Sequence, residues 1–251
     1  MSSTIWTQCA GSSEIRPLAT DAWRVVEAQH LIATRKLVDS DAEQTVLEEI
    51  LESQKPPARD VERFHYLLFT PFRYPPLPHG SRFAGRWEPS LWYGAEELRG
   101  ALAEVAYYRL VFLEGTAAEL GLVQTALTAF VVPVKTKRGV DLTRTPFIRW
   151  ESQLASKTSY AATQPLGTAM REDGVEAFLY RSARDPEASR NVGVFTPRAF
   201  GARKPRELQT WHASATQDVV EISRRDYFAK DSFRFPREVF LVDGQLPRPS
   251  L

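Results

Sequence analysis

The segment TPFRYPPLPHGSRFAGRWEPSLWYGAEELRGALAEVAYYRLVF, residues 70–112, contains the features that decide the fold. Its first part, residues 70–89, carries prolines and glycines that are incompatible with a regular helix or strand. Residues 90–93 predict a short strand. From Glu96 to about Phe112, apolar residues recur at helical spacing and predict a strong helix. A loop as long as 70–89 is uncommon inside a compact domain unless it has a function.

Upstream of this segment, the sequence predicts a tail and a helical hairpin. Residues 1–18 are rich in Ser and Thr and show no periodicity, which indicates a tail. Helical spacing predicts one helix over 20–38. A second begins at Ser40, because Ser40 and Glu43 have the spacing of a capping box. The Lys55-Pro56-Pro57 sequence ends the hairpin, since proline stops helix propagation.

Downstream, the pattern is dominated by short β-type runs. It also predicts a loop over 141–149 and a helix over 159–171. The predicted strands are 61–69, 125–134, 175–180, 192–196, 208–213, 219–222 and 239–242. We therefore expect an α+β fold with a mixed or antiparallel sheet core, in which residues 1–60 form the tail and hairpin and residues 61–251 form one large domain.

Composition excludes several classes of protein. The chain has 251 residues and a net charge of +1, which gives no support to a general nucleic-acid or membrane-surface polycation. The single cysteine excludes an internal disulfide, and the four histidines lack ligand-like spacing, so we expect no metal site. No apolar run approaches the roughly 20 residues of a membrane span. Without a secretory signal at its N-terminus, the chain is expected in the cytoplasm.

Three arginines in the loop are candidate anion ligands. Arg73, Arg82 and Arg86 lie close together in the sequence, and guanidinium groups bind phosphate oxygens in a bidentate manner. Two or three of them on one loop would suit a diphosphate. The alternative is a solvated basic loop that pairs with nearby glutamates.

Aromatic residues accompany these arginines. Tyr74, Trp87, Trp92 and Tyr93 offer faces that stack on nicotinamide or adenine, although aromatic residues fill cores more often. Arginines mixed with aromatics suit a nucleotide ligand, and the same mixture suits single-stranded nucleic acid.

Glu104 is the candidate catalytic carboxylate. It lies within the apolar part of the predicted helix, among alanines and Val105. A carboxylate there is either paired with an arginine and structural, or partly desolvated and aimed at a developing positive charge.

The segment 70–112 resembles the RES-domain family, which is named for an arginine, a glutamate and a serine. The arginine matches Arg73 in FRYPP, and the glutamate matches Glu104 in ALAE. The serine matches Ser182 in LYRSARDP. Arg86 in GRW and Tyr93 in WYGA also fall on family motif positions.

The resemblance extends over roughly residues 64–243 and includes Arg82 in GSRF less specifically. It implies a fold similar to ADP-ribosyltransferases, with residues 61–251 as an NAD-binding catalytic domain. It also implies an NAD-consuming toxin of a bacterial toxin–antitoxin pair, whose Xre-like antitoxin we expect to cover the active site near Arg73 and Arg86. Family members transfer ADP-ribose to a protein, to phosphate or to water, and the resemblance does not choose among these acceptors.

The resemblance assigns a role to each residue. Glu104 would stabilise the oxocarbenium character that develops when the nicotinamide–ribose bond breaks. Arg73, and next Arg86, would hold the diphosphate of NAD. Tyr93 would stack on or orient the nicotinamide ribose. Ser182 would bind the nicotinamide or its ribose, or position Glu104.

Two further residues and a second class of function remain open. His79 in the loop is a candidate ligand contact, and Arg184 is a candidate for phosphate or partner contact. The alternative function is a non-catalytic nucleotide or nucleic-acid binding module, which the near-zero net charge disfavours. A metal-dependent nuclease is disfavoured by the sparse set of metal ligands.

Overall fold

The computed structural model of the chain describes residues 4–28, 40, 42–43, 46–47, 49–50, 63–74, 77–226 and 230–248. The helices are α1 (Ile5–Gln8), α3 (Tyr66–Arg73), α4 (Leu98–Gly115), α5 (Glu151–Leu154) and α6 (Thr163–Glu172). The strands are β1 (Arg16–Glu27), β2 (Trp92–Ala95), β3 (Val123–Asp141), β4 (Ala177–Arg181), β5 (Arg190–Val194), β6 (Glu207–Ala215), β7 (Val219–Arg224) and β8 (Ser232–Pro236). Short 3-10 turns are η1 (Gly11–Glu14), η3 (Phe147–Trp150), η4 (Pro197–Ala199) and η5 (Arg237–Phe240).

The strands of the described residues form one mixed sheet with the order β1-β2-β5-β4-β3-β6-β7-β8. The β3–β4 pair is parallel and the other pairs are antiparallel. Because β1 also pairs with β3, the strands β1, β2, β5, β4 and β3 close a ring of pairings, from which β6, β7 and β8 extend. The expected α+β class with a mixed sheet is confirmed.

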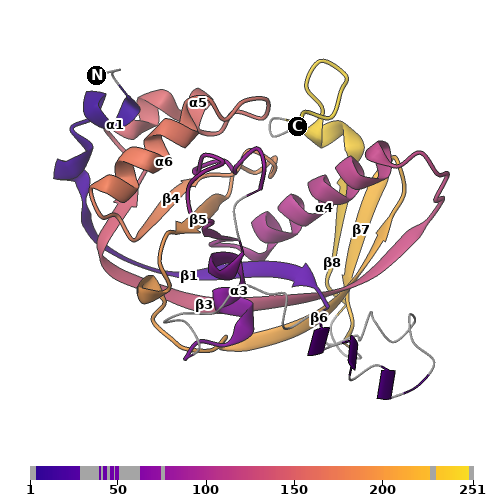
Figure 1. Cartoon of the computed structure of the whole chain (residues 1–251). Helices are drawn as coiled ribbons and strands as arrows, with labels where there is room; N and C mark the ends of the chain where they lie inside the picture. Colours follow the sequence, from indigo (N-terminus) through magenta and orange to yellow (C-terminus); the bar gives the residue numbers. More distant parts are fainter. Residues whose placement is uncertain are drawn as a thin grey trace.

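The long strand β3 joins the two halves of the sheet. Its residues 123–131 pair with β6, and residues 127–139 pair with β1 on its other side. Its last residues, 139–141, pair with β4. Figure 1 shows β1 and β3 running side by side as long curved strands through the middle of the molecule.

Helices cover both faces of β3. Since successive strand residues point to opposite faces, Leu127 and Ala129 pack in the core that contains α4, whereas Phe130 and Val132 pack in the core that contains α3. A third core brings α1 and α6 together. In Figure 1, α4 lies beside β7 and β8, and α1, α5 and α6 gather at the other end of the sheet.

The prediction of an N-terminal tail is wrong. Ile5 and Trp6 on α1 are buried in the core that contains α6. The Trp6 ring stacks on Phe147, and its Nε1 donates a hydrogen bond to Asp173 at 2.6 Å. The four-residue helix α1 is too short to show periodicity, and its partners lie far along the chain.

The prediction of a helix over 20–38 is wrong in its first part. Residues 16–27 form β1, and each residue from Leu18 to Glu27 pairs with a residue of β3. Tertiary pairing overrides the local helical spacing of Trp23 and Val26. Residues 29–39 lie outside the described residues.

The second helix of the predicted hairpin is described only in part. The described residues 42–43, 46–47 and 49–50 are helical. The Ser40 Oγ accepts a hydrogen bond from the Glu43 N–H at 3.2 Å, as expected for the N-cap of a capping box.

Two predicted strands are also wrong. Within the segment 61–69, the chain enters helix α3, and His65 caps it by accepting from the Leu67 N–H at 3.3 Å through Nδ1. Leu67 and Leu68 of this apolar run pack against a face of the sheet and do not add a strand to the sheet. The segment 239–242 includes the end of η5, and β8 lies before it.

Candidate active site

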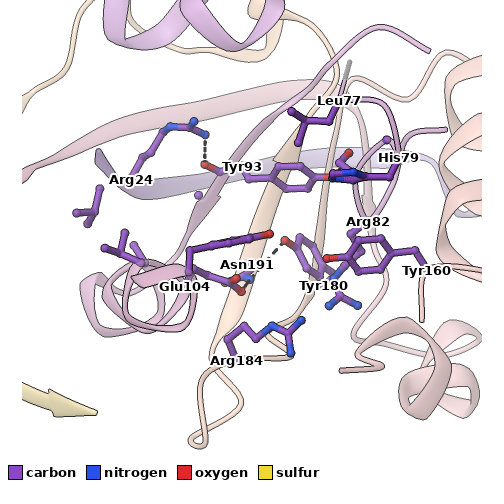
Figure 2. Close-up of a pocket in the computed structure, with 17 residues that line it drawn as sticks. Arg24, Leu77, His79, Arg82, Tyr93, Glu104, Tyr160, Tyr180, Arg184 and Asn191 are labelled. Atoms are coloured by element: carbon purple, nitrogen blue, oxygen red, sulfur yellow. Dashed lines mark hydrogen bonds between the residues drawn. The ribbon is translucent and has the colours of Figure 1, made fainter. Parts of the chain in front are cut away.

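A cavity of about 320 Å³ opens between helix α4, strands β1, β2 and β5, and the loop 77–82. Such a volume is within the range of small-molecule sites. Figure 2 shows polar side chains from these elements converging on it. The lining residues are Arg24, Val25, Leu77, His79, Gly80, Ser81, Arg82, Tyr93, Gly94, Ala101, Glu104, Val105, Tyr108, Tyr160, Tyr180, Arg184 and Asn191.

Glu104 lies at the centre of this lining, and α4 positions it. The helix buries Leu102, Ala103 and Ala106 in the core that it shares with β6 and β7, and the half-buried Glu104 faces the cavity together with Ala101. Its Oε1 accepts hydrogen bonds from Asn191 Nδ2 at 2.9 Å and from Ser182 Oγ at 3.2 Å. Neutral donors therefore hold this carboxylate, and among the described residues no ion pair involves it.

Ser182 lies directly behind Glu104, in the turn between β4 and β5. Its Oγ also accepts from the N–H groups of Arg184 at 3.2 Å and Asp185 at 3.0 Å. Only 5% of Ser182 is exposed, and it is not among the lining residues. The geometry therefore favours positioning of Glu104 over direct ligand contact for this serine.

Asn191 is a site residue that the sequence reasoning missed. It is 1% exposed on β5, and its Nδ2 bridges Glu104 Oε1 and the Tyr180 hydroxyl, the latter at 3.4 Å. The Nδ2 atom, and not Oδ1, faces Glu104, because an ionised carboxylate only accepts hydrogen bonds and therefore requires a donor. Its Oδ1 is buried and has no hydrogen-bond partner among the described residues. A polar residue on a strand of otherwise apolar or small residues, NVGV, was the signal that could have found it.

Arg24 was also missed, because its segment was assigned to a helix. From β1, its Nη1 donates to the backbone oxygen of Tyr93 at 2.7 Å, and its guanidinium lies 5.4 Å from the centre of the Trp92 ring. Burial lowers the pKa of Arg24 to about 10. The side chain is therefore still cationic at neutral pH. Figure 2 shows it on one side of the cavity, away from Arg184.

Arg82 and Arg184 lie on the other side. The Arg82 side chain is buried, donates to the backbone oxygens of Leu154 at 3.2 Å and Ser156 at 2.9 Å, and lies over the Tyr160 ring. Arg184 is 2% exposed and lies 3.7 Å from the centre of the Tyr107 ring. Its Nη1 and Nη2 atoms are buried, and no residue in the described part of the chain forms a hydrogen bond with them.

Tyr93 lines the cavity, and its hydroxyl forms hydrogen bonds with the neighbouring loop. It accepts from the Phe83 N–H at 3.0 Å and shares a hydrogen bond with Ser81 Oγ, also at 3.0 Å. These bonds attach the loop 77–82 and the residues after it to β2. Burial raises the pKa of Tyr93 to about 12, so the phenol is neutral at physiological pH.

Three predicted ligand residues are not brought to the cavity. Arg73 is the last residue of α3, and neither it nor Tyr74 is among the lining residues. Arg86 is exposed and stacks on the ring of Trp87, which is itself 83% exposed. The loop turns back on itself through the Ser81–Ala84 bridge, so Arg82 points inward and Arg86 points outward. Of the three loop arginines, the structure thus places only Arg82 at this cavity.

The described residues contain no group of three or more His, Cys, Asp and Glu side chains that could hold a metal ion. None of the helices in the described part of the chain is both long and apolar enough to span a bilayer.

The family model of the RES domain matches residues 57–216, well over half of the chain. The chain belongs to the RES-domain family. This family is associated with NAD-utilising toxins, which indicates an NAD-related enzymatic role. A comparison with curated proteins found no match.

Proposed function

We propose that this chain cleaves the nicotinamide–ribose bond of NAD, as the toxin of a bacterial toxin–antitoxin pair. One observation carries the proposal: a carboxylate held by two neutral donors faces a cavity that also contains three arginines, Arg24, Arg82 and Arg184. NAD combines a cationic pyridinium, a ribose and an anionic diphosphate, and this lining offers partners of complementary charge. The orphaned polar atoms of Arg184 and Asn191 support a polar ligand.

In the proposed reaction, the bond between ribose C1′ and the nicotinamide nitrogen breaks, and its electron pair leaves with nicotinamide. Positive charge develops on the ribose, as in glycoside hydrolysis. The Glu104 carboxylate stabilises that charge more strongly in the transition state than in the ground state. A nucleophilic oxygen or nitrogen of the acceptor then forms the new bond to C1′ and loses its proton to solvent.

Asn191 and Ser182 act as positioning residues in this scheme. Because both donate to Glu104 Oε1, they restrict the carboxylate to one orientation and reduce the reorganisation that accompanies charge development. The buried tyrosines around them are neutral phenols, since burial raises the pKa values of Tyr93 and Tyr180. They add no negative charge that would compete with Glu104.

The substitution Glu104→Gln tests the proposal. It retains the shape and removes the negative charge, so we expect the NAD cleavage rate to fall by at least about a hundredfold, equivalent to ~2.7 kcal/mol. Chromatography of the products, with and without added phosphate and a protein extract, distinguishes transfer to protein, phosphate and water.

Glu114→Gln is the matched control, because Glu114 lies at the far end of α4 and pairs with Arg237 at 3.0 Å. This control retains the rate of the natural protein. NAD cleavage by Glu104→Gln at the unaltered rate excludes the mechanism. If the unaltered protein binds NAD without consuming it, the chain is a nucleotide-binding module instead.

A further inference from the structure

An ion pair outside the cavity joins helix α4 to the β4–β5 turn. Arg99 Nε on α4 lies 3.2 Å from Asp185 Oδ1 and 3.0 Å from Glu187 Oε1. The Asp185 side chain is completely buried, whereas 65% of the Glu187 side chain is exposed. The helix and the turn also approach closely at the next residue of α4, since a Cβ added to Gly100 would lie 2.4 Å from Ser189 Oγ.

The buried carboxylate of Asp185 depends on this one arginine. In the described part of the chain, Arg99 is the only cation that pairs with Asp185, whose Oδ2 atom is buried without a hydrogen-bond partner there. Removal of Arg99 therefore leaves an uncompensated buried charge, which reaches water only if the turn moves. The pair with the exposed Glu187 is a surface ion pair and contributes little by comparison.

The position of Arg99 in its helix conflicts with the local electrostatics. Arg99 lies in the first turn of α4, where the positive end of the helix dipole disfavours a cation. A residue that violates a local rule is explained by its contacts elsewhere in the fold. For Arg99, these contacts are the two carboxylates of the β4–β5 turn.

Asp185 supports Ser182 through its backbone. The Asp185 N–H donates to Ser182 Oγ at 3.0 Å, and the Arg184 N–H donates to the same oxygen at 3.2 Å. A hydroxyl has two lone pairs and one hydrogen, so these bonds leave Ser182 only its hydrogen to give. The acceptor of that hydrogen is Glu104 Oε1 at 3.2 Å. A displaced Asp185 would therefore disturb the orientation of Glu104.

These contacts form a closed circuit that begins and ends on α4. Glu104 is held by Ser182, and Ser182 is held by the Asp185 N–H. The Asp185 carboxylate is held by Arg99, which lies on the same helix as Glu104. The helix that carries the candidate catalytic carboxylate thus also carries the cation that fixes its hydrogen-bond donor.

We propose that Arg99 and Asp185 are positioning residues for the cleavage of NAD, and that their ion pair keeps Ser182 aligned as a donor to Glu104. This inference rests on the proposed function for its reaction. Neither Arg99 nor Asp185 lines the cavity, so their replacement leaves the KM for NAD nearly unchanged. It lowers kcat, because the orientation of the carboxylate matters most in the transition state.

Steady-state NAD cleavage by Arg99→Gln and Asp185→Asn tests the proposal. We expect kcat to fall by about tenfold to a hundredfold, as for a small misplacement of a reacting group. Arg99→Lys retains the charge and recovers most of the rate. Glu187→Gln is the matched control, because it removes the exposed partner of the same arginine, and it retains the kcat of the unaltered protein.

A double-mutant cycle with Ser182→Ala separates positioning from a general loss of structure. If Arg99 acts through Ser182, adding Arg99→Gln to Ser182→Ala lowers kcat by less than about twofold, because the supported hydrogen bond is already absent. A merely structural role lowers kcat by the product of the two single effects. Thermal unfolding by circular dichroism identifies the variants that are folded at the assay temperature. Should Arg99→Gln be unfolded there, Asp185→Asn takes its place in the cycle.

Amide hydrogen exchange gives a readout that needs no turnover. The N–H groups of Arg184 and Asp185 are bonded to Ser182 Oγ, so Arg99→Gln accelerates their exchange by at least about tenfold more than that of the β3 amides. Glu187→Gln produces no such local acceleration.

Unchanged kcat in Arg99→Gln and Asp185→Asn, while the unaltered protein cleaves NAD, overturns the positioning role and leaves the proposed function intact. Effects that multiply in the cycle, or exchange that accelerates equally in β3, overturn it as well. If the unaltered protein cleaves no NAD, the proposed function fails, and the positioning role fails with it.

Discussion

At the scale of single residues, the candidate site is organised around one oxygen atom. Glu104 Oε1 takes hydrogen bonds from Asn191 and Ser182, which lie on either side of the β4–β5 turn. Ser182 in turn is fixed by two backbone N–H groups, of Arg184 and Asp185. The carboxylate is thus held through a chain of contacts that ends in the backbone, which is the most rigid support available to a side chain.

Tyr93 gives a pH prediction at this scale. Its phenol retains its proton in the folded chain up to a pH of about 12, whereas the phenol of the unfolded chain loses its proton near 10. The unfolded state therefore binds fewer protons between these values, and the free energy of unfolding falls as the pH rises through that window. The contribution of this residue is at most about 1.4 kcal/mol per pH unit.

Urea unfolding at pH 9, 10, 11 and 12 measures this effect in the unaltered protein and in Tyr93→Phe. The variant loses about 1 kcal/mol at pH 9, since the Phe83 N–H loses its acceptor, and declines less steeply at high pH. Parallel declines in the two proteins contradict the assignment. The same measurement on Tyr180→Phe shows how much of the decline belongs to the second buried phenol.

The residues of the site differ in how far the sequence predicts them. Glu104 is predictable, because a carboxylate among alanines on an amphipathic helix violates the local pattern. Arg82 and Arg86 look equivalent in sequence, and only the turn at residues 81–84 sends one inward and the other outward. Asn191 has one local signal, its polar side chain within an apolar run, whereas Arg24 has none, since its segment has helical spacing and its contacts are made with another strand.

At the scale of elements, the sequence predicts a helix or strand correctly when its conformation does not depend on a segment far along the chain. Helix α4 and the first part of strand β3, residues 125–134, are predicted because their own periodicity and composition decide them. The rest of β3, to Asp141, is not predicted. Strand β1 is mispredicted because its conformation is decided by pairing with β3, far along the chain. Helix α3 is mispredicted because its apolar run packs under the sheet instead of joining it.

Helix α6 closely contacts the loop 77–91, and this contact predicts how a larger side chain on the helix affects stability. A Cβ added to Gly167 on α6 lies 2.0 Å from the backbone oxygen of Phe83, so Gly167→Ala forces the loop that carries Ser81 and Arg82 away from the helix. We expect a loss of about 1–3 kcal/mol in the free energy of unfolding, with a reduced rate of NAD cleavage.

Gly115→Ala is the matched control. A Cβ at Gly115, the last residue of α4, meets nothing within 4 Å, so this change is neutral or stabilises by up to about 1 kcal/mol. Urea unfolding compares the two variants with the unaltered protein. If Gly167→Ala proves as stable as Gly115→Ala, the loop does not depend on close approach to α6.

At the scale of the whole molecule, the fold uses more of the chain than the family match covers. The match spans residues 57–216, but β1 lies before it and β7 and β8 lie after it. Trp6 is buried in one core, and Phe235 and Phe240 are buried in another. Both flanks therefore contribute to the hydrophobic cores.

A fragment limited to residues 57–216 tests this dependence. Without β1, the strand β3 loses its longest pairing, and without β7, β8 and η5 the α4 core loses Val220, Phe235 and Phe240. We expect no cooperative thermal transition in far-UV circular dichroism, whereas the full chain unfolds cooperatively. A cooperative thermal transition of the fragment shows that residues 57–216 fold independently of the two flanks. A fragment of residues 4–248, which keeps both flanks, is the control.

The ring of pairings has a consequence for biosynthesis. Arg24 on β1, Glu104 on α4, and Ser182 and Asn191 around the β4–β5 turn come from distant parts of the chain. A ribosome-bound nascent chain that has emerged only through α4 has the carboxylate but neither of its two donors. The proposed toxic activity is therefore absent until strands β4 and β5 have emerged and paired.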